Sequence, residues 1–248
     1  MSAPPERGPG RNIAGAEYVQ ALTARESDRR ARAAFQARAL GLAPAGARIY
    51  DFGAGPGLDA RHYALAGRRV EAYDIDPTMC EYFAGYCADL IERGVVVLHA
   101  PDYGAFLGAA PRAPQAAADL VTANFAPLNL VTDLGALFAA LAALLRPGGR
   151  MLASVLNPYY AGDLRYGWFW RNLPRFLASG RFAVPGAQAL IWRRSLAVYA
   201  ACAAPYFVLE RVHRDDPDDA GGGLDPHAPG ARWRLTGSRF MFLQLRRL

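Results

Sequence analysis

The stretch that decides the fold is Asp51-Phe52-Gly53-Ala54-Gly55-Pro56-Gly57, which follows an apolar run and precedes a helical pattern. Three glycines at alternate positions let the backbone turn tightly and approach a ligand closely. The helix that follows presents free N–H groups and the positive end of its dipole to the same loop. The stretch therefore predicts a strand, a turn and a helix, with a polar ligand lying across the turn.

A second signal, Asp74, lies seventeen residues after Gly57, in the run VEAYDID. A carboxylate at the end of this predicted strand can accept hydrogen bonds from both hydroxyls of a ribose. The glycines are spaced GxGxG and not GxGxxG, because Leu58 stands where the dinucleotide fingerprint needs its last glycine. The pattern favours a nucleoside and counts against NAD.

Short apolar runs alternate with helical stretches over residues 47–157; the runs are ARIYDFG, RRVEAYDID, VVVLHAPD, ADLVTANF and RMLASVLN. Such alternation implies right-handed crossovers and a parallel sheet with helices on both faces. Two later runs, YFVLERVHR and SRFMFLQLRRL, are joined by a loop rich in Asp, Gly and Pro and predict an antiparallel hairpin. The predicted fold class is α/β, a doubly wound, mostly parallel seven-stranded sheet with a terminal antiparallel hairpin.

The chain is expected to form one domain behind a short tail. Residues 1–15 are rich in Pro, Gly and Arg, and we expect a flexible tail there. Residues 16–248 form the expected domain, which opens with a helix over about residues 17–40 that covers the ligand cleft. The alternation stops after Asn157, and an insertion rich in aromatic residues and arginine, at about 158–191, is typical of a lid or substrate wall.

The composition excludes several mechanisms. The 248 residues are 52% apolar and 20% charged, which suits one large core. All 28 basic residues are arginine, so chemistry that needs a phosphate-loop, Schiff-base or kinase-type lysine is excluded. Cys80, Cys87 and Cys202 are too few and too scattered for a zinc cage or a secreted disulfide framework. We expect no metal site, no stable membrane insertion and a cytoplasmic location.

Together these motifs resemble the class I S-adenosylmethionine-dependent methyltransferases. The matching stretches are DFGAGPG, YDID-P, Asp102 after the third strand, DLVTANFAPLN, LLRPGGRMLASV and the final hairpin. Residues 45–157 carry the resemblance best. It implies an enzyme that transfers a methyl group from S-adenosyl-L-methionine to a small-molecule acceptor.

The resemblance also implies where the cofactor lies. Asp51 and the glycine loop would hold its methionine end, Asp74 its ribose and Ile75 one face of its adenine. The remaining contacts follow the third and fourth strands: Asp102 with Tyr103 at the adenine edge, and Asn124 with Phe125 beside the sulfonium.

No catalytic residue can be assigned from the sequence. Methyl transfer from a sulfonium consumes charge, so an aligned, dry pocket supplies most of the acceleration. A general base is needed only where the acceptor must lose a proton. The candidates are His62, His99, His213 and His227, and none of them forms a recognisable sequence pair with Asp or Glu.

The segment YYAGDLRYGWFWRNLPRF, residues 159–176, contains seven aromatic residues and follows the fifth strand, where open α/β sheets place their crevice. One interpretation is a substrate wall for an aromatic or apolar acceptor. The residues of such a wall would be Tyr18, Tyr160, Trp168 and Trp170, with Arg165 available to an acidic group.

Two other interpretations of this segment are packing of the insertion onto the domain and contact with a membrane surface. Residues 159–194 contain six arginines and one acid, so most of the net charge of +6 lies there. A nucleic-acid partner is not expected, because no recognised binding module accompanies the charge. For the whole protein, a cofactor-binding partner protein without turnover and a nucleotide-dependent oxidoreductase stay open as alternatives.

Overall fold

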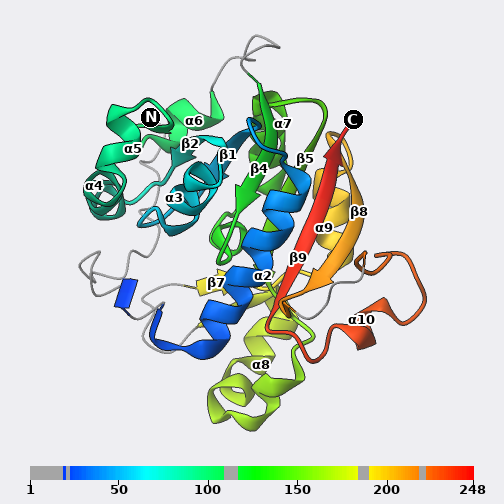
Figure 1. The fold of residues 1–248 in the computed structure, drawn as a ribbon. Helices are drawn as coiled ribbons and strands as arrows, with labels where there is room; N and C mark the ends of the chain where they lie inside the picture. The colour runs from blue at the N-terminus through cyan, green and yellow to red at the C-terminus, as the bar shows by residue number, and fades with distance from the viewer. Residues whose placement is uncertain (1–18, 21–22, 109–116, 184–189, 218–221) are drawn as a thin grey trace, which may run out of the picture.

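The computed structural model describes residues 19–20, 23–108, 117–183, 190–217 and 222–248 (Figure 1). The predicted tail over residues 1–15 lies outside the described residues, and so does Tyr18. A seven-stranded sheet forms the centre, in the order β3-β2-β1-β4-β5-β9-β8. Its strands are β1 (Arg48–Phe52), β2 (Arg69–Tyr73), β3 (Val96–Leu98), β4 (Ala118–Ala123), β5 (Leu145–Leu156), β8 (Phe207–Arg214) and β9 (Phe240–Arg247).

Strands β1 to β5 pair in parallel, and β9 runs antiparallel between β5 and β8. Neighbouring residues of β1 point to opposite faces, since Ile49 lies in one buried apolar cluster and Tyr50 in the other. Both faces are therefore covered, as continuous apolar runs in parallel strands require. The predicted α/β class, the doubly wound sheet and the terminal hairpin are confirmed.

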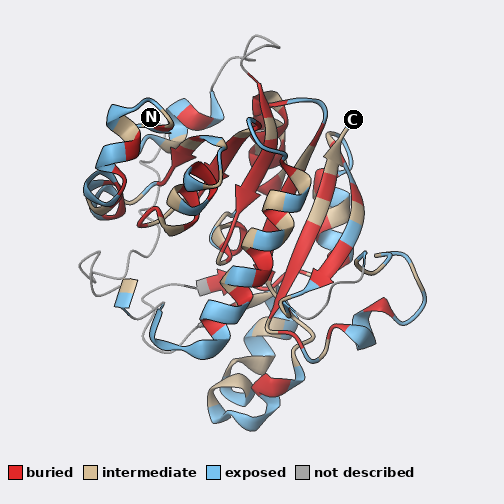
Figure 2. Ribbon diagram, viewed as in Figure 1, coloured by how far each residue is buried: buried red, intermediate tan, exposed pale blue. Residues whose placement is uncertain are grey.

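Helices cover the two faces of the sheet in separate groups (Figures 1 and 2). One face carries α2 (Glu26–Leu42), α3 (Leu58–Leu65), α4 (Pro77–Tyr86) and α5 (Ala88–Glu92). The other face carries α6 (Tyr103–Leu107), α7 (Leu134–Leu144) and α9 (Leu196–Ala203). Short helical segments follow β4 and β8, η2 (Pro127–Asn129) and α10 (Ala231–Arg234).

The leading helix differs from its prediction at both ends. Residues 19–20 and 23–24 are helical, but Arg25 has an extended backbone, and α2 begins only at Glu26. The helix continues past Gly41 and stops at Ala43, which is also extended. Pro44 explains this end, because the residue before a proline is disfavoured in the helical region.

The insertion after β5 has its own secondary structure, which the sequence did not reveal. It consists of η3 (Ala161–Arg165), α8 (Gly167–Ser179) and a separate antiparallel pair, β6 (Arg181–Ala183) with β7 (Leu190–Trp192). Because β5 ends at the carboxyl edge of the sheet, the insertion begins at the edge where the glycine loop lies, and α8 extends beyond it (Figure 1). In the described part of the chain, every helix is too short or too polar to cross a membrane.

Candidate functional site

The glycine loop connects β1 to α3, and its three glycines have different surroundings. All three have positive φ angles, which side chains rarely adopt. A Cβ atom on Gly53 would lie 2.6 Å from Pro127, and one on Gly57 would lie 2.7 Å from the ring of Phe83. A Cβ atom on Gly55 would meet nothing within 4 Å. The outer two glycines therefore allow close packing, whereas Gly55 borders open space.

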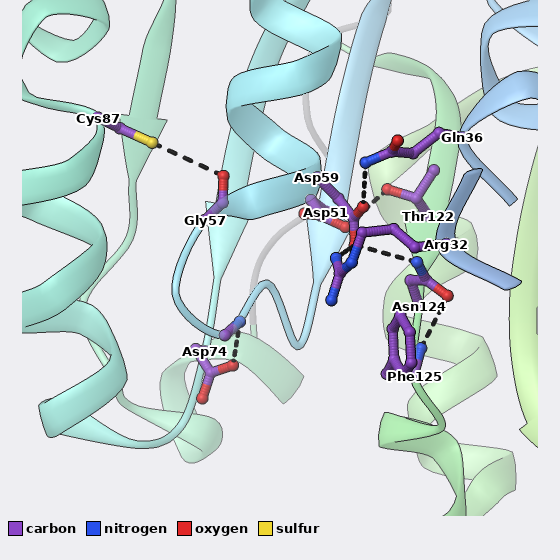
Figure 3. Close-up of polar contacts among 11 residues, drawn as sticks. Arg32, Gln36, Asp51, Gly57, Asp59, Asp74, Cys87, Thr122, Asn124 and Phe125 are labelled. Carbon is purple, nitrogen blue, oxygen red and sulfur yellow. Dashed lines mark hydrogen bonds and ion pairs between the residues drawn. The ribbon is translucent and has the colours of Figure 1, made fainter. Parts of the chain in front are cut away.

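Asp74 lies directly beside this open position. Its Oδ2 accepts a hydrogen bond from the N–H of Gly55 at 2.7 Å (Figure 3). Its Oδ1 accepts one from the N–H of Asp76 at 2.9 Å. Burial raises the pKa of the Asp74 carboxyl, and the two N–H donors oppose that rise. The bonds fix the carboxylate at the end of β2 and leave each oxygen a second lone pair.

Asp51, the last polar residue of β1, is fully buried. Its Oδ1 accepts a hydrogen bond from the hydroxyl of Thr122 on β4 at 2.7 Å. Its Oδ2 is buried without a hydrogen-bond partner among the described residues. Burial, and after it the charge of Asp59, raises the pKa of Asp51 to about 7. The site thus contains a buried carboxylate with an unused acceptor atom.

Asp59 organises a polar cluster that the sequence reasoning missed (Figure 3). This buried side chain on α3 accepts hydrogen bonds from Arg32 at 2.5 Å, from Gln36 at 2.7 Å and from Asn124 at 3.0 Å. Its donors come from α2 and from the end of β4, so one carboxylate connects three elements. The spacing of Arg32 and Gln36 indicates that both lie on one helix face, but it does not identify Asp59 as their partner.

The backbone after β4 adopts an unusual conformation. Phe125 and Ala126 have φ angles of 57° and 68°, which only glycine adopts without strain. The N–H of Phe125 donates to the Asn124 side chain at 2.9 Å, and the Arg32 guanidinium lies 4.4 Å from the centre of the Phe125 ring. Strain of this kind persists where the surroundings enforce it, often at functional sites. Asn124, Phe125 and Arg32 therefore form one connected side of the candidate site.

Three predicted cofactor-binding residues follow strands β2 and β3. Ile75 is 44% exposed and follows Asp74. Asp102 is exposed and caps α6 by accepting a hydrogen bond from the N–H of Ala105 at 2.9 Å. Tyr103 is half-buried and stacks on Phe106 at 5.9 Å between ring centres. The capping bond accounts for Asp102 structurally and leaves its second oxygen available.

The predicted substrate residues other than Tyr18 lie within the insertion. The half-buried ring of Trp168 packs edge-on against Phe182 at 5.9 Å, whereas Trp170 is 54% exposed. Tyr160 is half-buried and turns its ring toward Gly162, and Arg165 donates to the carbonyl of Gly162 at 3.0 Å. These contacts hold the insertion together.

A buried ion pair anchors the insertion. Arg193 donates to the Asp163 carboxylate, and both side chains are more than nine-tenths buried. The Arg193 guanidinium also lies 4.8 Å from the ring centre of Phe182. Neither partner was singled out from the sequence, because their pairing depends on the tertiary fold.

Histidine pairing also differs from the expectation. His99 Nε2 lies 2.9 Å from the Glu71 carboxylate, although the sequence showed no such pair. The pair sits at the β2–β3 side of the sheet, and the His99 ring stacks on Tyr50. His213 lies 3.1 Å from Gln244, and His62 and His227 are exposed. Within the described ranges no cluster of three or more His, Cys, Asp or Glu could hold a metal ion.

Comparisons with known proteins agree with this geometry. A family model described as a methyltransferase domain matches residues 23–193, more than half of the chain. A ubiquinone biosynthesis O-methyltransferase of Xanthomonas axonopodis pv. citri (strain 306) is 37% identical over 122 residues, which are 47% of this chain. The match covers 46% of that enzyme, so the chain aligns with about half the length of the curated relative.

Solved structures share the fold. An S-adenosylmethionine-dependent methyltransferase from Mesorhizobium loti has a TM-score of 0.62 and 21% identity, covering 86% of this chain and 98% of its own. The 1,6-didemethyltoxoflavin-N1-methyltransferase of Burkholderia thailandensis has a TM-score of 0.58 and 19% identity, covering 100% and 93%. The family model, the sheet order and the glycine loop converge, and the chain belongs to the methyltransferase-domain family, among the class I S-adenosylmethionine-dependent methyltransferases.

Proposed function

We propose that this protein transfers a methyl group from S-adenosyl-L-methionine to a small-molecule acceptor. The observation that carries the proposal is the junction of Asp74 with Gly55, which sets a buried carboxylate beside the open position of the glycine loop. A nucleoside placed across this loop would meet Asp74 through its ribose hydroxyls and Ile75 through its adenine. Asp102 and Tyr103, one strand further along, would meet the adenine edge.

The charge of the site suits a cationic cofactor. Asp51, Asp59 and Asp74 are buried around the loop, and Arg32 pairs with Asp59. The unused Oδ2 of Asp51 would face the methionine end, where the ammonium group and the sulfonium carry positive charge. A cation nearby also favours the ionised form of Asp51, so cofactor and carboxylate stabilise each other.

Asn124 and Phe125 would line the sulfonium side. Asn124 is fixed because its amide donates to Asp59 while its oxygen accepts from the N–H of Phe125. A rigid wall aligns the donor with its acceptor and keeps water out, and both effects lower the barrier of an in-line displacement. S-adenosyl-L-methionine supplies the activated methyl group, and we assign no residue as a general base.

The acceptor class follows from the family at a coarse level. One relative is named as an O-methyltransferase and a structural neighbour as an N1-methyltransferase of a small molecule. We therefore propose a small organic acceptor that is methylated on oxygen, nitrogen or carbon, since another structural neighbour is named as a C-methyltransferase, with no nucleic-acid partner. We also propose a cytoplasmic location, because two of the three cysteines, Cys80 and Cys87, are buried as free thiols.

Calorimetry with S-adenosylmethionine and S-adenosylhomocysteine tests the cofactor site. Asp74→Ala removes both oxygens that face the ribose, so we expect affinity to fall by about a hundredfold, the loss of two charge-assisted hydrogen bonds. The matched control is Asp119→Ala, which removes a partner of Arg146 at the start of β4, where the sheet's opposite edge lies. This control should bind both ligands like the wild type.

Two outcomes would overturn the proposal. Binding of NADH in place of S-adenosylmethionine would indicate a nucleotide-dependent oxidoreductase. Binding of the methyl donor without transfer to any of a broad panel of phenols, amines and carboxylic acids would indicate a cofactor-binding partner protein without turnover.

A further inference from the structure

Helix α8 presents side-chain stripes that differ in burial. Phe169, Leu173 and Phe176 are spaced i, i+4 and i+7 and are half-buried. Phe169 and Phe176 pack on Phe182, with ring centres 5.8 and 4.6 Å apart. This inner stripe attaches α8 to the rest of the insertion.

The next stripe is apolar and exposed. Trp170, Pro174 and Leu177 repeat the same spacing about 100° further around the helix, and Trp170 is 54% and Leu177 76% exposed. The indole N–H of Trp170 donates to the backbone carbonyl of Leu164 at 2.9 Å, so the exposed Leu164 lies next to this stripe. These four residues are named the outer stripe. Exposed apolar side chains gathered in this way mark an interaction surface.

Arginines border the outer stripe. Arg171 and Arg175 each follow one of its members, and both are exposed, as is Arg165 in η3. The one acid in residues 159–194, Asp163, is buried in its pair with Arg193 and does not neutralise them. These three residues, the arginine flank, therefore present positive charge beside an apolar surface.

We propose that the outer stripe and the arginine flank dock this protein on the surface of an anionic membrane. A helix lying in the plane of a bilayer inserts its apolar side chains between lipids while arginines meet the phosphates. A tryptophan ring suits the boundary, because it is apolar with one polar N–H. Because α8 projects beyond the edge of the sheet (Figure 1) and carries no buried residue (Figure 2), it can meet a deformable surface along its length.

Charge complementarity and shape favour a lipid surface over a protein partner. Phospholipid headgroups supply closely spaced phosphates along the whole flank, and the acyl boundary accepts separate Trp and Leu side chains without a preformed pocket. The docking is peripheral, and it does not depend on the methyl-transfer proposal, since no residue of the cofactor site takes part.

Vesicle co-sedimentation tests the outer stripe. The 248-residue chain is mixed with phosphatidylcholine vesicles that contain phosphatidylglycerol, and with pure phosphatidylcholine vesicles. Trp170→Ser combined with Leu177→Ser should weaken binding to the anionic vesicles at least about tenfold, because the inserted apolar area is lost. The matched control, Trp233→Ser combined with Leu65→Ser, removes exposed side chains outside the insertion and should bind like the wild type.

The arginine flank is tested by Arg171→Gln combined with Arg175→Gln. Binding should weaken about tenfold or more and lose most of its salt dependence. Arg69→Gln combined with Arg93→Gln lowers the net charge equally at exposed positions elsewhere and serves as the control. Unchanged thermal unfolding and unchanged S-adenosylhomocysteine binding would show that all variants are folded.

Several results would overturn the proposal. They are a wild type that stays in the supernatant with both vesicle types, equal binding to neutral and anionic vesicles, and outer-stripe variants that bind like the wild type. A wild type that ignores vesicles but self-associates through Trp170 and Leu177 would instead identify the stripe as an interface between copies. Loss of methyl transfer with intact vesicle binding would overturn only the proposed function.

Discussion

At the scale of single residues, Asp51 carries a carboxyl whose protonation depends on the fold. Its pKa is about 7 in the folded protein against 3.8 for the free side chain, because burial and Asp59 disfavour the charge. Between these two pH values the native state holds a proton that the unfolded state has released, so the free energy of unfolding falls as pH rises from about 4 to about 7. Above about pH 7 the Asp51 side chain is ionised in both states, so its titration lowers the free energy of unfolding no further.

Asp51→Asn removes this titration. We expect the variant to exceed the wild type in free energy of unfolding by about 2 kcal/mol or more near pH 8, and the difference to shrink toward pH 5. Urea unfolding at both pH values measures it, with Asp89→Asn at an exposed position as the control. A difference that stays constant between the two pH values would show that Asp51 keeps its charge when buried.

Arg32 offers a second prediction at this scale, because its partner Asp59 is buried. Arg32→Gln leaves that carboxylate with the weaker donors Gln36 and Asn124. We expect a loss of about 3 kcal/mol in the free energy of unfolding. The matched control, Arg29→Gln, breaks an exposed pair with Glu26 and should cost less than about 1 kcal/mol. Equal losses in chemical denaturation would mean that the Arg32 pair is solvated.

The same residues show what the sequence could reveal. The tight glycine turn between β1 and α3, and the position of Asp74 at the end of β2, could be predicted, because their spacing in the sequence carries the signal. The cluster around Asp59 could not, since its partners Arg32 and Asn124 lie 27 and 65 residues away and only the fold brings them together. Features set by residues close in the sequence were therefore predictable, whereas contacts between residues of different elements were not.

At the scale of elements, buried parallel strands were predictable because they read as continuous apolar runs. The insertion was recognised by composition alone. The helical spacing of Phe169, Leu173 and Phe176 was an available signal for its helix α8. Its anchor, the pair Arg193–Asp163, was not predictable, because the two residues lie 30 apart and only the fold brings them together. The stretch follows β5 in the structure, and the end of the sheet alternation at that point is visible in the sequence.

Within the insertion, Trp168 and Trp170 should behave differently. Trp168→Ala removes a ring that packs on Phe182, so the insertion should loosen, proteolysis there should accelerate and methyl transfer should fall sharply. Trp170→Ala changes an exposed ring and should leave transfer to a soluble acceptor unchanged. Both variants should bind S-adenosylmethionine within a few fold of the wild type. Turnover at the wild-type rate by both variants would show that the insertion does not shape the acceptor site.

At the scale of the whole molecule, both faces of the sheet are buried, but they contribute unequally to the candidate site. Helix α2 packs on one face, where Phe35 is fully buried and meets Phe242 edge-on at 5.2 Å. The same helix carries Arg32, which reaches Asp59 at the cofactor edge. On the other face, Phe207 of β8 is buried against Phe138, at the far end of the sheet.

We therefore predict that Phe35→Ala and Phe207→Ala separate stability from cofactor binding. Each removes a buried ring and should cost about 3–5 kcal/mol in the free energy of unfolding. Phe35→Ala also loosens the helix that holds Arg32, so we expect the affinity of this variant for S-adenosylhomocysteine to fall about tenfold below that of the wild type. Phe207→Ala should bind with normal affinity while it remains folded. Urea unfolding and calorimetry on both variants measure the two effects. If both lose affinity equally, cofactor binding depends on the stability of the whole sheet, and α2 has no special role.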